Sequence, residues 1–91
     1  MDISNKILQL ITENIQVFKI NIIDESYKHA NHKKDTKGGH YKLLVVSNNF
    51  KGMSLLKRHQ SIYQILDNMM RVDIHALSMK ILTEEEYNNS K

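Results

Sequence analysis

The chain has 91 residues, of which 41% are hydrophobic and 25% charged, and its formal net charge is +3. This composition is that of a globular protein and excludes a disordered chain, while the lack of cysteine excludes disulfides and any thiolate site made by this chain alone. No apolar run approaches the roughly 20 residues of a membrane span, and the N-terminus lacks a targeting pattern. We therefore predict a single cytoplasmic domain over residues 1–91, without membrane contact.

The first segment has the pattern of an amphipathic helix. Isoleucines recur at every fourth position from Ile3 to Ile15, which places them on one face of a helix over residues 3–15. Asp2 or Ser4 can begin this helix, because either side chain can accept a hydrogen bond from a free backbone N–H group.

Two strands are predicted next. Residues 17–23, "VFKINII", alternate between apolar and polar, so that Phe18, Ile20 and Ile22 share the buried side of a half-buried strand. Residues 41–47, "YKLLVVS", are apolar on both sides and predict a more buried strand that pairs antiparallel with the first.

A second amphipathic helix is predicted over roughly residues 55–70, with Ser54 as its N-cap. His59 lies on its apolar stripe, which predicts a buried, hydrogen-bonded core histidine. The stripe consists of Leu55, Leu56, Ile62, Tyr63, Leu66, Met69 and Met70.

Residues 73–82 read as a third strand, and Thr83 with Glu86 three positions later forms a capping box that begins a last helix. The element order is therefore α-β-β-α-β-α. Strands on either side of a helix require a crossover connection, which gives a three-stranded mixed sheet with helices on one face, an α+β fold.

The histidines are the conspicuous functional residues. Residues 29–40, "HANHKKDTKGGH", hold three of the five histidines, in a connection that is long for so small a domain. From the residues alone a metal site, a basic patch for nucleic acid and a solvated loop all remain open. His75 alternates with Leu77, Met79 and Ile81, so the pattern of its strand turns it toward the core.

Four motifs carry a resemblance to a known family. They are "DESYKH" (24–29), "VVSNNFKG" (45–52), "RHQSIY" (58–63) and "IHALSM" (74–79). In this order and spacing they resemble the BolA-like proteins. The resemblance implies an α-β-β-α-β-α domain related to the class II KH fold, in agreement with the order predicted from the residues.

The resemblance also implies a cofactor and a partner. Members of the family pair with monothiol glutaredoxins and share a [2Fe–2S] cluster, to which the glutaredoxin contributes its active-site cysteine and a bound glutathione. The BolA-like chain contributes the histidine of the "HAL" motif, here His75, and a cysteine or histidine from the loop between the first two strands. Because this chain has no cysteine, it resembles the histidine subgroup. The family's loop histidine maps onto His29, with His40 and His32 as alternatives because the loop is longer than usual.

These implications predict a non-enzymatic adaptor that shares or receives a [2Fe–2S] cluster in iron–sulfur trafficking or iron homeostasis. We expect a monomer without cofactor when the chain is alone, and a heterodimer with its glutaredoxin partner. No nucleophile elbow, P-loop, HExxH motif or paired-carboxylate pattern indicates an enzyme.

The alternative function is that of a KH-like, nucleic-acid-binding transcriptional regulator. Lys51, Lys57 and Arg58 lie in or beside the turn before the second helix, whose N-terminal end favours anions. Two features count against DNA as a partner: the sequence lacks the GXXG loop with which KH domains clamp a backbone, and aromatic stacking residues are sparse.

Overall fold

A computed structural model describes residues 2–26 and 39–90 of the chain. Its elements are α1 (Ile3–Asn14), β1 (Lys19–Asp24), β2 (Gly39–Val46), the short 3₁₀ helix η2 (Asn48–Phe50), α2 (Leu55–Ile65), α3 (Asp67–Val72), β3 (Ile74–Leu82) and α4 (Glu84–Asn89). The predicted order of helices and strands is confirmed. The second predicted helix is divided in two, because the backbone of Leu66 leaves helical geometry between α2 and α3.

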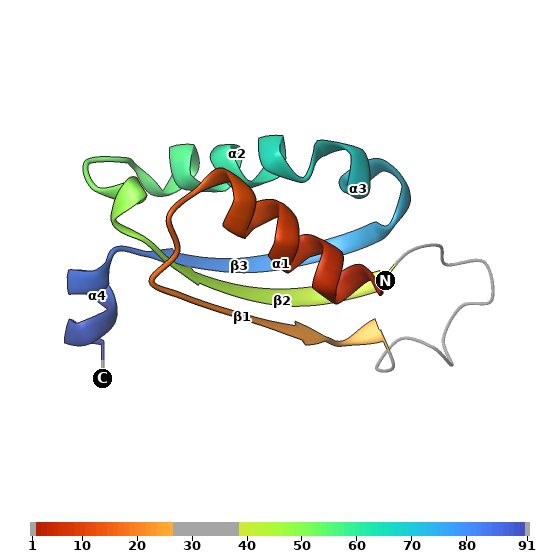
Figure 1. Cartoon of the computed structure of the whole chain (residues 1–91), viewed down its shortest axis with the longest axis horizontal. Coiled ribbons are helices and arrows are strands. Elements are labelled where there is room, and N and C mark those ends of the chain that lie inside the picture. Colours follow the sequence, from red (N-terminus) through yellow and green to blue (C-terminus); the bar gives the residue numbers. More distant parts are fainter. Residues whose placement is uncertain (1, 27–38, 91) are drawn as a thin grey trace.

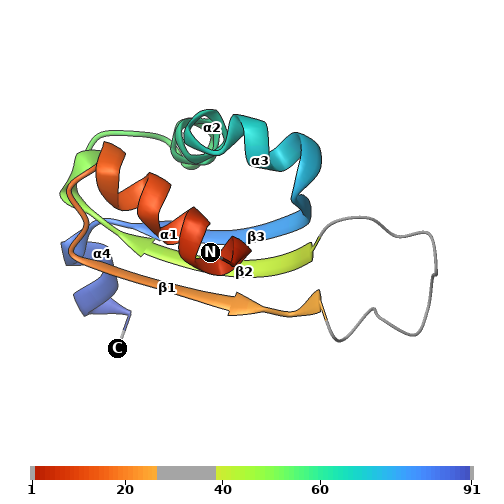
Figure 2. The ribbon, with the colours of Figure 1, turned by 45° about the vertical axis from the view of Figure 1, so that its right-hand side comes forward.

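The sheet has β2 at its centre, antiparallel to β1 and parallel to β3. The helices α1, α2 and α3 lie on one face of the sheet, and α4 lies at the end where β3 stops (Figure 1). A view from a second direction shows no described helix along most of the opposite face (Figure 2). The predicted three-stranded mixed sheet with helices on one face is confirmed, whereas the relation to class II KH domains stays a prediction.

The helix ends follow the predicted caps. The Asp2 side chain accepts a hydrogen bond from the backbone of Asn5 (2.8 Å), and the Ser54 side chain accepts one from Lys57 (3.2 Å). None of the helices within the described residues has the length and apolar character needed to cross a membrane.

The core lies between the sheet and helices α1 to α3. Its fully buried side chains come from both layers: Ile7, Ile11, Leu43, Val45, Phe50, Ile62 and Leu66. Five of the eight residues of β2 are buried, as predicted from its apolar character on both sides, and Tyr41, Leu43 and Val45 belong to this core. Burial of this apolar surface is the main favourable contribution to folding of so small a domain.

Some of the side chains predicted to lie in the core do not. Leu55 and Leu56 are 69% and 67% exposed. The inward face of α2 is made by Arg58 and Ile62, so the buried stripe begins one turn later than predicted. His59, predicted as a core histidine, is half-buried because it lies beside this inward face.

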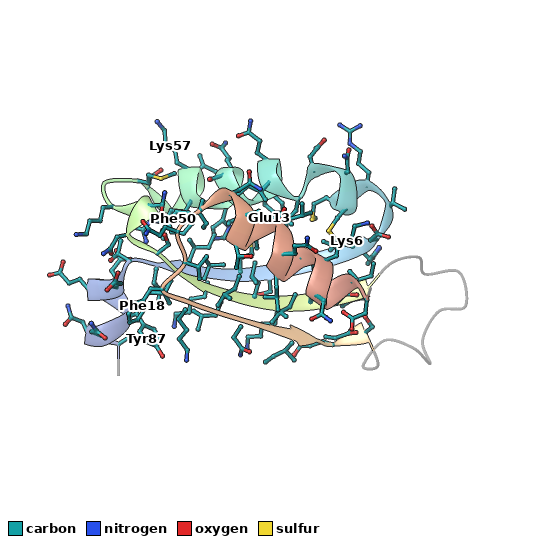
Figure 3. The ribbon with its side chains drawn as sticks, in the orientation of Figure 1. Lys6, Glu13, Phe18, Phe50, Lys57 and Tyr87 are labelled. Atoms are coloured by element: carbon teal, nitrogen blue, oxygen red, sulfur yellow. The ribbon has the colours of Figure 1, made fainter. Side chains whose placement is uncertain are left out.

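Phe18 is also exposed, to 55%, although it was predicted to share the buried side of the first strand. The strand β1 begins at Lys19, two residues later than predicted, so Phe18 is not held by the alternation of that strand. Its ring instead packs against Tyr87 of α4, with the ring centroids 6.5 Å apart (Figure 3).

Arg58 connects three elements in the interior and is only 6% exposed. Its guanidinium donates to the carbonyl oxygens of Met53 (3.1 Å) and Ile81 (3.0 Å). It also donates two hydrogen bonds to the carboxylate of Glu86 (2.6 and 3.1 Å). The charged group of Arg58 is thus used within the protein, which weakens the prediction of Arg58 as a nucleic-acid contact.

Glu86 has a second role as part of the capping box of α4. Its carboxylate accepts a hydrogen bond from the backbone N–H of Thr83 (2.9 Å), and its own N–H donates to the Thr83 hydroxyl (3.2 Å), as predicted. The hydrogen bonds from Arg58, followed by that from Thr83, lower the pKa of Glu86 to about 2, from an ordinary value of 4.5.

We predict that Arg58→Met lowers the free energy of unfolding by about 3 kcal/mol, because buried carbonyl oxygens lose their charged donor. Urea denaturation at neutral pH measures the effect. The matched control is Arg71→Met, which removes an arginine from an exposed ion pair with Asp67 (3.2 Å) and should change little. Equal effects of the two substitutions would contradict the structural role of Arg58.

A pH dependence follows from Glu86. Because its pKa is lower in the folded than in the unfolded protein, it stabilises the fold above pH 4.5, and this contribution is lost as the pH falls toward about 2. The urea midpoint of the wild type should therefore decline over this range more than that of Glu86→Gln. Parallel declines of the two proteins would show that Glu86 is not the group responsible.

Candidate metal centre

The pairing of β2 with β3 is irregular at its start. Gly39 pairs with Ile74, but His40 pairs with Ala76, so His75 is an extra residue without a partner on β2. An extra residue of this kind is a β-bulge, and it reverses which positions of a strand face each side. His75 is consequently exposed. The prediction from strand alternation that His75 faces the core is wrong for this reason.

The bulge places His75 next to His40. The centroids of the two imidazole rings are 4.9 Å apart, and the ring planes are inclined by 48°. His75 is exposed, whereas His40 is half-buried and its Nε2 atom is covered by the surrounding protein. The pair therefore presents one accessible imidazole, with a second directly beside it.

The backbone of His40 is fixed by the end of β1. Its N–H donates to the hydroxyl of Ser26 (3.0 Å), and its carbonyl accepts from Glu25 (2.7 Å). Ser26 in turn donates its backbone N–H to the carboxylate of Asp24 (2.9 Å). Hydrogen bonds from the side chain and backbone of Ser26 lower the pKa of Asp24, which keeps this acceptor ionised.

The residues on either side of His40 fix the direction of its side chain. Tyr41 is 7% exposed and faces the core, where burial raises the pKa of its phenol. Its ring lies over Gly39, at whose position a Cβ atom would come within 2.5 Å of the ring. With Gly39 and Tyr41 both on the helix-covered side, His40 between them faces the open side of the sheet.

Two adjacent imidazoles are chemically suited to the binding of a metal. Neutral imidazole nitrogen is a common metal ligand, and two histidines can replace two cysteines on one iron of a [2Fe–2S] cluster. Within residues 2–26 and 39–90 no group of three or more histidine, cysteine or acidic side chains could hold a metal ion. The two imidazoles could supply two of the ligands of a metal ion or cluster.

The other candidate residues lie elsewhere. His29 and His32 fall outside the described residues, so their predicted role stays a prediction. Lys51 and Lys57 are exposed near the N-terminal end of α2, and Lys57 projects away from the sheet (Figure 3). His40 was an alternative candidate in the sequence, but the adjacency of His40 and His75 depends on a bulge that has no local sequence signal.

The comparison with known proteins identifies the family. A sequence model described as BolA-like protein matches residues 11–86. The chain belongs to the BolA-like family. This BolA-like chain is 36% identical to the DNA-binding transcriptional regulator BolA of Haemophilus influenzae over 87 residues, which cover 96% of this chain and 82% of that protein.

Solved structures agree with the family. BolA1 from Arabidopsis thaliana is 30% identical, with a TM-score of 0.83 over 94% of this chain and 96% of the other. The BolA domain of SufE1 from Arabidopsis thaliana is 32% identical, with a TM-score of 0.81 over 94% of this chain and 98% of that domain. The BolA-like fold predicted from the four motifs is therefore confirmed.

Proposed function

We propose that this BolA-like chain is a non-enzymatic adaptor that pairs with a monothiol glutaredoxin and shares or receives a [2Fe–2S] cluster. The observation that carries the proposal is the adjacency of the imidazoles of His40 and His75, whose ring centroids are 4.9 Å apart at the open face of the sheet. A pair of imidazoles at a surface can ligate one iron, while thiolates from the partner and from glutathione ligate the other.

The cluster, when bound, supplies an iron atom that accepts nitrogen ligands. In this chain His75 is the accessible donor, and His40 is the companion that the described geometry favours. His29 and His32 remain alternatives to His40 as the second ligand. Protons compete with metal for imidazole nitrogen, so a cluster held in this way should be released more readily in acid than one held by cysteines alone.

The family relationship supports a role as an adaptor or a regulator rather than an enzyme. A domain of this family occurs in a SufE-like protein, whose name suggests a connection with iron–sulfur assembly. The cytoplasmic location, the monomeric state of the isolated chain and the heterodimer with glutaredoxin are parts of this proposal.

Nucleic-acid binding is the second candidate function, and the name of the Haemophilus influenzae relative supports it. The prediction of a nucleic-acid surface at Lys51, Lys57 and Arg58 is weakened, because Arg58 is buried and paired with Glu86. Of that predicted surface, Lys51 and Lys57 remain exposed.

Co-expression of the chain with a monothiol glutaredoxin tests the adaptor. We predict that the complex shows the visible absorption and circular dichroism of a [2Fe–2S] cluster, and that His75→Ala changes both spectra strongly. The matched control is His59→Ala, which removes a half-buried histidine from α2 and should leave the spectra unchanged. A His75→Ala complex with wild-type spectra would refute the ligand assignment.

The same spectra identify the second ligand. His40→Ala, His29→Ala and His32→Ala are each compared with His75→Ala. We expect His40→Ala to reproduce the altered spectra, because its ring lies beside that of His75. If only His29→Ala or His32→Ala does so, the second ligand comes from the segment between β1 and β2 instead.

A further inference from the structure

The helix-free face of the sheet is a surface that the adaptor function does not fully use. The strand register assigns to it alternate residues of each strand, on the side away from α1 to α3 (Figures 1 and 2). Apart from the histidine pair, these positions are Lys19, Asn21, Ile23, Lys42, Leu44, Val46, Ala76, Ser78, Lys80 and Leu82. Val46 is fully buried, and Leu44 and Leu82 are half-buried.

This face has an unbalanced charge. Lys19, Lys42 and Lys80 are exposed, one on each strand, and none of the strand positions assigned to the face is an aspartate or glutamate. Lys80 pairs with Leu44 and Lys42 pairs with Ser78, so the two lysines are diagonal neighbours on adjacent strands. Like charges placed so closely on one face oppose folding slightly. Lys19 also has a contact within the protein, because its ammonium lies 5.8 Å from the centroid of the Tyr87 ring.

We propose that the helix-free face binds the phosphate backbone of nucleic acid through Lys19, Lys42 and Lys80. This inference deepens the second candidate function by naming its surface, and that surface differs from the one predicted at Lys51 and Lys57. β-Sheet faces are an established means of contacting nucleic acid. Lysine side chains on a flat face can approach successive phosphates as point charges.

A nucleic-acid partner fits this face better than an acidic protein does. Lysine is depleted in protein–protein interfaces, whose centres are rich in aromatic side chains, whereas nucleic-acid interfaces are strongly positive and polar. The strand positions of the face include no aromatic residue. Because these lysines contact phosphates and few groups on the face can read base edges, the binding should be independent of sequence and sensitive to salt.

The test is fluorescence anisotropy of a labelled 30-base-pair DNA of random sequence, titrated with the isolated chain at two salt concentrations. We expect Lys42→Gln/Lys80→Gln to weaken binding about fivefold or more at low salt and to reduce the slope of log affinity against log salt by roughly two. The matched control is Lys6→Gln/Arg71→Gln, which removes two exposed positive charges from α1 and α3 and should change affinity less than twofold. All four positions are exposed, so unchanged melting temperatures are expected.

The proposal would be overturned by no binding of the wild type, by equal losses in the two double variants, or by a loss confined to Lys51→Gln/Lys57→Gln. Weakened glutaredoxin pairing with unchanged DNA affinity in Lys42→Gln/Lys80→Gln would also overturn it, in favour of an acidic protein partner. Failure here is distinct from failure of the adaptor function, because the cluster spectra of the glutaredoxin complex respond to His75→Ala and involve no DNA.

Discussion

The irregular parallel pairing of β2 with β3 is the interaction on which the candidate site depends. Without the bulge, the alternation that turns Leu77, Met79 and Ile81 toward the helices would also turn His75 toward them and Ile74 away from them. The bulge removes His75 from the ladder, so that Ile74 stays 4% exposed while His75 reaches the surface. The extra residue therefore allows Ile74 to pack in the core while its neighbour His75 lies at the surface site.

The two ends of β3 are held by different means. At its start, the backbone N–H of Gly39 donates to the carbonyl of Asp73 (3.0 Å), and the close packing of Tyr41 on Gly39 excludes a side chain there. At its end, Arg58 donates to the carbonyl of Ile81 and joins α2 to α4 through Glu86. A domain with so small a core benefits from such polar connections, because apolar burial alone leaves a narrow margin of stability.

Much of the fold could be predicted from the sequence because its signals are local. The isoleucines at every fourth position of α1 and the capping box of Thr83 and Glu86 can be recognised from residues that are close together in the sequence. The positions of His75 and Arg58 could not be predicted in this way. His75 depends on the register between strands that are distant in the chain, and Arg58 is buried because carbonyl and carboxylate groups from other elements surround its guanidinium.

The imidazoles of His40 and His75 lie together on the open side of the sheet, and this arrangement should exist in the isolated chain. Nuclear Overhauser effects between the ring protons of assigned histidines measure this directly in solution. We expect cross-peaks between the rings of His40 and His75, and none between the His75 ring and the methyl groups of Leu43 or Val45. Cross-peaks from His75 to those buried methyl groups, without any to His40, would contradict it.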